Sequence, residues 1–87
     1  MTYYKEEKIS KNVFIRVFSP DIDYPWHRDA EDRLLYILSC DDNWALQIDD
    51  CLPVRLSTGG QYSIPREVFH RIIPGEGDLI VKVTKIY

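Results

Sequence analysis

A two-residue hydrophobic period, interrupted at short intervals by turn-forming residues, limits the folds open to this chain. In segment 11–19, Val13, Ile15 and Val17 alternate with other residues, and Phe14 and Phe18 fall on the opposite side. A period of two is typical of a β-strand, because successive side chains of a strand point to opposite faces. No segment has a convincing helical period. The pattern therefore predicts an all-β protein.

The same period marks about eight short strands. Beyond an N-terminal strand that includes Tyr3, Tyr4 and Ile9 and packs on a partner chain, they are expected over segments 11–19, 33–40, 44–49, 54–57, 61–64, 68–73 and 78–87. Segment 33–40 is almost continuously apolar, which is typical of a strand buried on both faces. Turn signals at 41–43, 49–50, 58–60 and 74–77 separate the strands. Evenly spaced short strands predict a sandwich or a small barrel.

Length and composition restrict the class of protein. The 87 residues, 45% of them hydrophobic and 29% charged, predict a single domain over 1–87. The net charge is −3 and the basic residues are scattered, so we expect no nucleic-acid partner. No apolar run resembles a signal peptide or a membrane span, so we expect no membrane partner. Cys40 and Cys51 do not form a Cys-x-x-Cys pair, and we expect reduced thiols and a cytoplasmic location.

Three potential metal ligands lie in two segments that are far apart in the sequence. His27 and Asp29 are two residues apart, so on an extended chain both side chains project from one face. His70 lies much later, on the strand after Ile64-Pro65. If those segments are neighbours, the three side chains converge. Two imidazoles and one carboxylate on one face form the triad of non-haem Fe(II) oxygenases, which leaves open positions for substrate and dioxygen.

Segment 21–40 resembles the first sequence motif of the cupin family. That motif runs glycine, five residues, His-x-His, three or four residues, glutamate, six residues, glycine. The corresponding positions here are Asp21, His27, Asp29, Arg33 and Cys40. The spacing fits, and Asp29 retains the ability to bind a metal where the family has its second histidine.

Segment 59–74 resembles the second cupin motif, which runs glycine, five residues, Pro-x-Gly, two residues, histidine, three residues, asparagine. The corresponding positions are Gly59, Pro65, Glu67, His70 and Pro74. The resemblance covers most of the chain. It implies a small jelly-roll barrel of about eight short antiparallel strands, a metal-sized pocket and often a homodimer. The short chain is also similar to the small single-domain cupins of bacterial and phage genomes.

Arg33 falls where the family has a glutamate ligand, and a guanidinium cannot bind a cation. In one interpretation, His27, Asp29 and His70 hold the metal, and Arg33 steers an anionic substrate beside it. In the other, Arg33 forms an ion pair with Asp29 that fills the pocket, and no metal binds.

Further polar residues are candidates for the same pocket. Tyr36 and Gln47 are expected to line it and orient a ligand, although strand parity alone does not decide their direction. Glu31 or Asp32 could replace a ligand if the loop slipped by a residue or two.

Three hypotheses for function follow. The first is a metal-dependent cupin, with Fe(II) favoured, that acts as a dioxygenase or an isomerase-type enzyme on a small anionic substrate. The second is a metal-free cupin that binds a small anion such as a sugar acid through His27, His70 and Arg33. The third is a structural dimer with a vestigial site. The sequence leaves open whether the protein is an enzyme.

Overall fold

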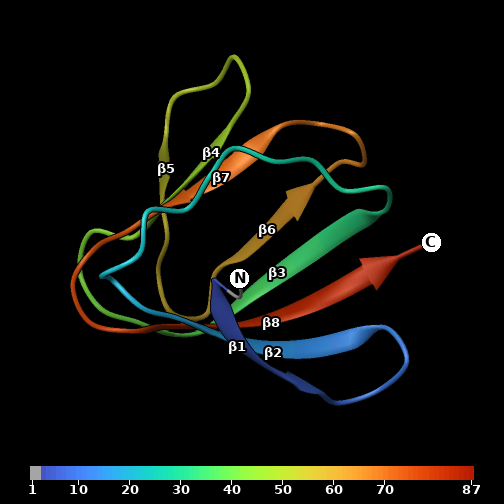
Figure 1. Cartoon of the computed structure of the whole chain (residues 1–87), viewed down its shortest axis with the longest axis horizontal. Helices are drawn as coiled ribbons and strands as arrows, with labels where there is room; N and C mark the ends of the chain where they lie inside the picture. The colour runs from blue at the N-terminus through green and yellow to red at the C-terminus, as the bar shows by residue number, and fades with distance from the viewer. Residues whose placement is uncertain (1–2) are drawn as a thin grey trace.

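The structure, a computed structural model, describes residues 3–87, and all of its regular secondary structure is β (Figure 1). The strands are β1 (Tyr4–Lys8), β2 (Val13–Phe18), β3 (Asp32–Cys40), β4 (Ala45–Ile48), β5 (Val54–Arg55), β6 (Gln61–Ile64), β7 (His70–Ile73) and β8 (Leu79–Ile86). The prediction of an all-β chain with about eight short strands is confirmed. In this range no helix is long and apolar enough to cross a membrane.

The strands form two antiparallel sheets that face each other (Figure 1). The larger sheet has the order β1-β2-β8-β3-β6 and the smaller one β5-β4-β7. From β3 onward the chain moves back and forth between the sheets, as in a jelly roll. Consequently residues far apart in sequence, such as those of β2 and β8, share the inner face of one sheet.

The core lies between the two sheets. Its fully buried side chains are those of Ile37, Trp44, Leu79, Val81 and Val83. Trp44 also directs its indole N–H to the carbonyl oxygens of Glu76 and Gly77, at 3.2 and 3.1 Å, so its one polar group is satisfied inside the core. Burial of these large apolar side chains is the main force that holds the sheets together.

β3 differs from its prediction in one respect, because it is buried on only one face. Leu35 and Ile37 point into the core, whereas Leu38 on the other face is 41% exposed. The apolar run predicted burial on both faces, and this is wrong for the single chain. The outer face of the larger sheet has no covering layer among residues 3–87.

Several turns adopt the left-handed backbone conformation. Asn43 and Asp50, in two of the predicted turns, have φ values of 72° and 60°. Glu67 has a φ of 61° at the position where the cupin motif has glycine. Glycine enters this region without steric cost, whereas glutamate is strained there by roughly 1 kcal/mol or more. Just before β7 the backbone at Glu67 therefore takes the conformation that glycine favours.

Candidate metal centre

His27 and His70 lie directly opposite each other in an antiparallel pair. The His27 N–H donates to the His70 carbonyl at 3.0 Å, and the His70 N–H donates to the His27 carbonyl at 2.8 Å. Their imidazole rings meet edge to face, with centroids 4.2 Å apart. The segment before β3 thus extends the smaller sheet beyond β7, and the backbone register alone places both rings together.

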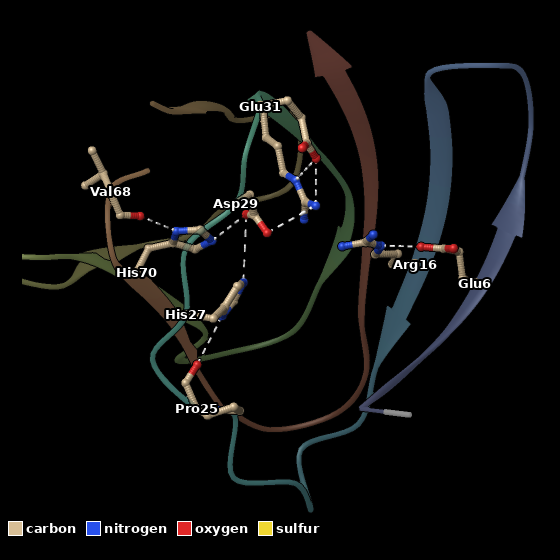
Figure 2. A network of polar contacts seen from close by, with 9 residues as sticks. Glu6, Arg16, Pro25, His27, Asp29, Glu31, Val68 and His70 are labelled. Carbon is tan, nitrogen blue, oxygen red and sulfur yellow. Dashed lines mark hydrogen bonds and ion pairs between the residues drawn. The ribbon is translucent and has the colours of Figure 1, made fainter. Parts of the chain in front are cut away.

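Backbone carbonyls fix the tautomer of both imidazoles. His27 Nδ1 lies 3.1 Å from the Pro25 carbonyl oxygen, and His70 Nδ1 lies 3.0 Å from that of Val68. Because a carbonyl oxygen only accepts, each Nδ1 carries the proton and donates it. In the neutral ring the lone pair is then on Nε2. Both Nε2 atoms face the same carboxylate, that of Asp29 (Figure 2).

The two oxygens of Asp29 have different surroundings. Arg33 approaches Oδ1 with a terminal nitrogen at 3.2 Å. Oδ2 lies 3.3 Å from His70 Nε2 and 4.0 Å from His27 Nε2. It is buried and has no hydrogen-bond partner within residues 3–87. A buried carboxylate oxygen without a donor is costly, so this atom calls for a cation or a proton.

Burial disfavours the charged form of His70, which would otherwise supply that proton. Its side chain is 3% exposed, and this desolvation lowers the pKa of His70 from its ordinary value. The nearby His27 acts in the same direction, whereas the Val68 carbonyl and Asp29 act in the opposite one. With His70 neutral, the lone pairs of its Nε2 and of Asp29 Oδ2 face each other. A divalent cation between them would satisfy both.

The donor set fits a metal ion. One ligand atom each from His27, Asp29 and His70 lies within 4.8 Å of the other two. Imidazole nitrogens and a carboxylate oxygen suit a divalent first-row metal, and imidazoles bound to metals usually donate their second N–H to a carbonyl or carboxylate, as both do here. The fold thus brings together the three residues that the sequence indicated as metal ligands.

Arg33 combines elements of both sequence interpretations. It pairs with Asp29, and it also donates Nε and a terminal nitrogen to Glu31 Oε1, at 3.1 and 2.9 Å. Burial alone would raise the pKa of Glu31, but the hydrogen bond and the charge of Arg33 lower it overall. Since Arg33 uses only Oδ1 of Asp29, the ion pair leaves Oδ2 free. Arg33 is therefore a residue that orients the candidate ligand Asp29, with its charge already balanced by two carboxylates.

The other candidate residues lie elsewhere. Tyr36 points out of the larger sheet beneath Lys82, whose Nζ is 5.4 Å from the ring centroid. Gln47 accepts a 2.9 Å hydrogen bond from Arg71. Neither lines the cavity described below, because each alternates with inward-facing neighbours on its strand.

The two acidic residues considered as substitute ligands are engaged elsewhere. Glu31 is held by Arg33, and Asp32 accepts hydrogen bonds from Arg66, including one from its backbone N–H at 2.7 Å. These hydrogen bonds lower the pKa of Asp32. Neither residue belongs to the group that could hold a metal ion.

A cavity of about 250 Å³ opens beside this group, between the sheets. Its lining residues include the candidate ligands, several aliphatic core residues and four aromatic ones, Tyr3, Tyr4, Phe18 and Tyr24. Tyr3 and Tyr4 thus line the cavity of their own chain. Tyr4 packs on Phe18 with ring centroids 5.3 Å apart, and Tyr3 lies 6.5 Å from Tyr24.

The sequence interpretation missed Arg16, which lines the same cavity from β2. Only 7% of the surface of Arg16 is exposed to solvent. A signal for it was present in the strand pattern, because Arg16 shares its face with Phe14 and Phe18. An arginine on the inward face of a strand is unusual and points to a specific partner.

No protein-family model matches the sequence, and no curated protein matches it. Solved structures do match. DMSP lyase DddQ from Ruegeria pomeroyi DSS-3 is 17% identical, with a TM-score of 0.75 over 90% of this chain and 40% of the lyase. An RmlC-like cupin with a double-stranded β-helix fold from Methanocaldococcus jannaschii is 22% identical, with a TM-score of 0.72 over 94% and 78% of the two chains.

A third match is a Neisseria meningitidis protein of similar size. It is 19% identical, with a TM-score of 0.75 over 100% of this chain and 88% of that one. By contrast, this chain spans only about 40% of the length of the DddQ lyase. Identities at this level show a shared fold.

Proposed function

Because this chain has the cupin fold, we propose that it is a small metal-binding cupin with His27, Asp29 and His70 as the metal ligands. The observation that carries the proposal is the Asp29 Oδ2 atom, which is buried without a hydrogen-bond donor and faces two imidazole nitrogens. Fe(II) is the favoured metal, since two histidines and one carboxylate are its usual set in non-haem oxygenases.

The chemistry proposed is that of a dioxygenase or an isomerase-type enzyme acting on a small anionic substrate. Bound Fe(II) would supply open coordination positions for dioxygen and for a chelating substrate. The residues of the chain hold and orient: carbonyls fix both histidine tautomers, and Arg33 fixes Asp29 through Oδ1. The His27 side chain is 45% exposed, so the site is open to solvent on that side. The DddQ neighbour is a DMSP lyase, which is consistent with small-molecule chemistry on this fold.

Alanine at the two histidines tests the metal proposal. The variant carrying both His27→Ala and His70→Ala should lose the bound metal, whereas alanine at the distant surface residue Glu7 should not. Metal retained by the double variant would sink the proposal. If the parent binds Fe(II), anaerobic addition of small carboxylic acids followed by oxygen measurements would test the dioxygenase proposal.

The second candidate is a metal-free cupin that binds a small anion, such as a sugar acid. The observation in its favour is the Arg33–Asp29 ion pair, which partly neutralises the carboxylate. Arg33→Glu separates the candidates, because it restores the glutamate of the family motif. Stoichiometric metal in this variant, with none in the parent, would favour the metal-free binder. Unchanged behaviour of every pocket variant except in stability would instead favour a structural protein with a vestigial site.

We also propose that the chain forms a homodimer. Among residues 3–87 the outer face of the larger sheet is uncovered, and the edge strand β1 pairs on one side only, with β2. Leu38 and Ile86 on that outer face are 41% and 47% exposed. Exposed sheet edges and apolar faces favour association. Light scattering coupled to size exclusion checks this, and a monomer at micromolar concentration would contradict it.

A further inference from the structure

We infer that Arg16 is the anion-binding residue of the cavity, and that the natural ligand is a small carboxylate with a compact apolar body. In this arrangement the carboxylate lies at Arg16, and the opposite end of the ligand faces His27, Asp29 and His70. The inference rests on the proposed function for the orientation of the ligand. The anion site itself needs no metal.

Arg16 is buried but sparsely bonded. Its side chain is 8% exposed, and its Nε pairs with Glu6 Oε2 at 2.5 Å across strands β2 and β1 (Figure 2). The guanidinium also lies over the Tyr4 ring, with Cζ 4.3 Å from the centroid. No acceptor within residues 3–87 other than Glu6 bonds to this guanidinium. Of its five N–H donors, four therefore lack a partner in the described chain.

The terminal nitrogens of Arg16 remain accessible, because neither is a fully buried atom without a hydrogen-bond partner. Since Arg16 lines the cavity, these donors are available to a group bound there. Terminal guanidinium nitrogens form a fork that fits the two oxygens of a carboxylate. A ligand carboxylate in the cavity would accept hydrogen bonds from these donors. The side chains around the cavity are mostly apolar and cannot do so.

Arg33 is poorly suited to the same task. It is already bonded to two carboxylates, those of Asp29 and Glu31. Arg16 has one carboxylate partner, Glu6, which is partly exposed to solvent. The Glu6 side chain is 34% exposed on the edge strand β1, which pairs only with β2. When a ligand carboxylate binds Arg16, the Glu6 carboxylate can therefore replace its bond to Arg16 by hydrogen bonds to water.

The walls of the cavity define the rest of the ligand. Tyr4, Phe18 and Tyr24 cover one side with aromatic surface, and Ile72 and Val83 are among the aliphatic residues that line it. The volume of about 250 Å³ is below the roughly 300–1,000 Å³ of sites for drug-sized ligands. These walls favour a small apolar body, such as one ring, between the anionic and metal-facing ends.

Calorimetric titration of the metal-free full-length chain tests the anion site. The probe is benzoate, and benzamide, of the same shape without the charge, is its control. We expect benzoate to bind more tightly than benzamide. Arg16→Gln should weaken benzoate at least about tenfold, because it removes a charged hydrogen-bond donor. Glu6→Gln should tighten benzoate several-fold, because it removes the competing carboxylate. A merely structural ion pair would not give tighter binding.

Lys82→Gln is the matched control, since it removes a cation from the outer face of the neighbouring strand β8. It should leave benzoate affinity unchanged. Equal affinity of the parent and Arg16→Gln, or no benzoate binding by either the parent or Glu6→Gln, would overturn the inference. If Arg16→Gln does not fold, as judged by circular dichroism, the Glu6→Gln result alone decides.

Metal titration of the same variants separates this inference from the proposed function. Arg16→Gln should bind metal like the parent, because Arg16 contacts none of the three proposed ligands. A parent that binds benzoate but no metal would retain the anion site and refute the metal proposal. If the parent binds metal and its benzoate affinity is unchanged in Arg16→Gln, the metal proposal is retained and the anion site is refuted.

Discussion

Each of the two charged walls of the cavity contains an arginine–carboxylate ion pair, but one wall lacks hydrogen-bond donors and the other lacks acceptors. At the wall of His27, Asp29 and His70, an arginine satisfies one carboxylate oxygen, and acceptors remain without donors. At the wall of Arg16, a carboxylate satisfies one nitrogen, and donors remain without acceptors. An ion pair inside a protein therefore need not have a purely structural role. Its unpaired atoms indicate which charge a ligand would bring to each wall.

Asp29→Asn should have the largest effect on this difference. An amide is a far weaker metal ligand than a carboxylate, and the loss of one ligand of the set is expected to weaken metal binding about a thousandfold, or roughly 4 kcal/mol. The amide N–H introduced by the substitution could instead donate to His70 Nε2, so the metal-free variant should be about as stable as the parent. Competitive chelator titration and urea unfolding measure both quantities. An unchanged metal affinity would contradict the ligand assignment.

Arg33→Met should follow in size. It leaves the side chains of Asp29 and Glu31, 13% and 12% exposed, without their shared cation. Breaking a pair at this depth should lower the free energy of unfolding by about 3 kcal/mol. Urea unfolding of the metal-free protein checks the value. A loss below about 1 kcal/mol would mean that the pair behaves as a solvated one.

Stability of the metal-free protein should also depend on pH through His70. Burial lowers its folded-state pKa, so between that pKa and the ordinary value of about 6.5 the unfolded chain binds more protons. The stabilisation from neutral His70 is therefore complete above about pH 6.5 and is lost as the pH falls below it. Urea unfolding at about pH 7.5 and about pH 5.5 should show this decrease. The same pH change should affect a His70→Gln variant less, and an equal decrease in both would refute the assignment.

Arg28→Ala should have the smallest effect and sets the baseline for the comparison. Arg28 pairs with Glu67 at 3.7 Å outside the cavity, and both side chains are more than half exposed. Exposed pairs contribute about 0–1 kcal/mol, so neither stability nor metal binding should change appreciably. A change as large as that of Arg33→Met would show that burial does not distinguish the two pairs.

Strand parity and motif spacing were enough to predict the fold and the three convergent residues. His27 and Asp29 share a face because they are two residues apart, and the second motif places His70 at the start of β7. Parity also contained the signal for Arg16, on the face of Phe14 and Phe18. It was missed because the strand was interpreted by its apolar residues alone.

Features that depend on three-dimensional partners could not be predicted. Arg33 pairs with Oδ1 of Asp29, and Glu31 shares the same guanidinium. Both features depend on side-chain directions that are fixed only once the loop has folded. The directions of Tyr36 and Gln47 were left open for the same reason, because which face of a strand points inward is known only after its register is fixed. The burial of β3 on one face depends on which layers cover the sheet, and an apolar run does not contain that information.

Metal stoichiometry tests the central claim most directly. Untagged protein should be purified without chelator, reconstituted anaerobically with Fe(II), and measured by elemental analysis beside His70→Ala. The arrangement of Asp29 Oδ2 and the two Nε2 atoms predicts about one metal per chain in the parent and little in the variant. No metal in the parent, whether measured before or after the reconstitution, would contradict the claim and leave the Asp29–Arg33 ion pair as a structural feature of an anion-binding protein.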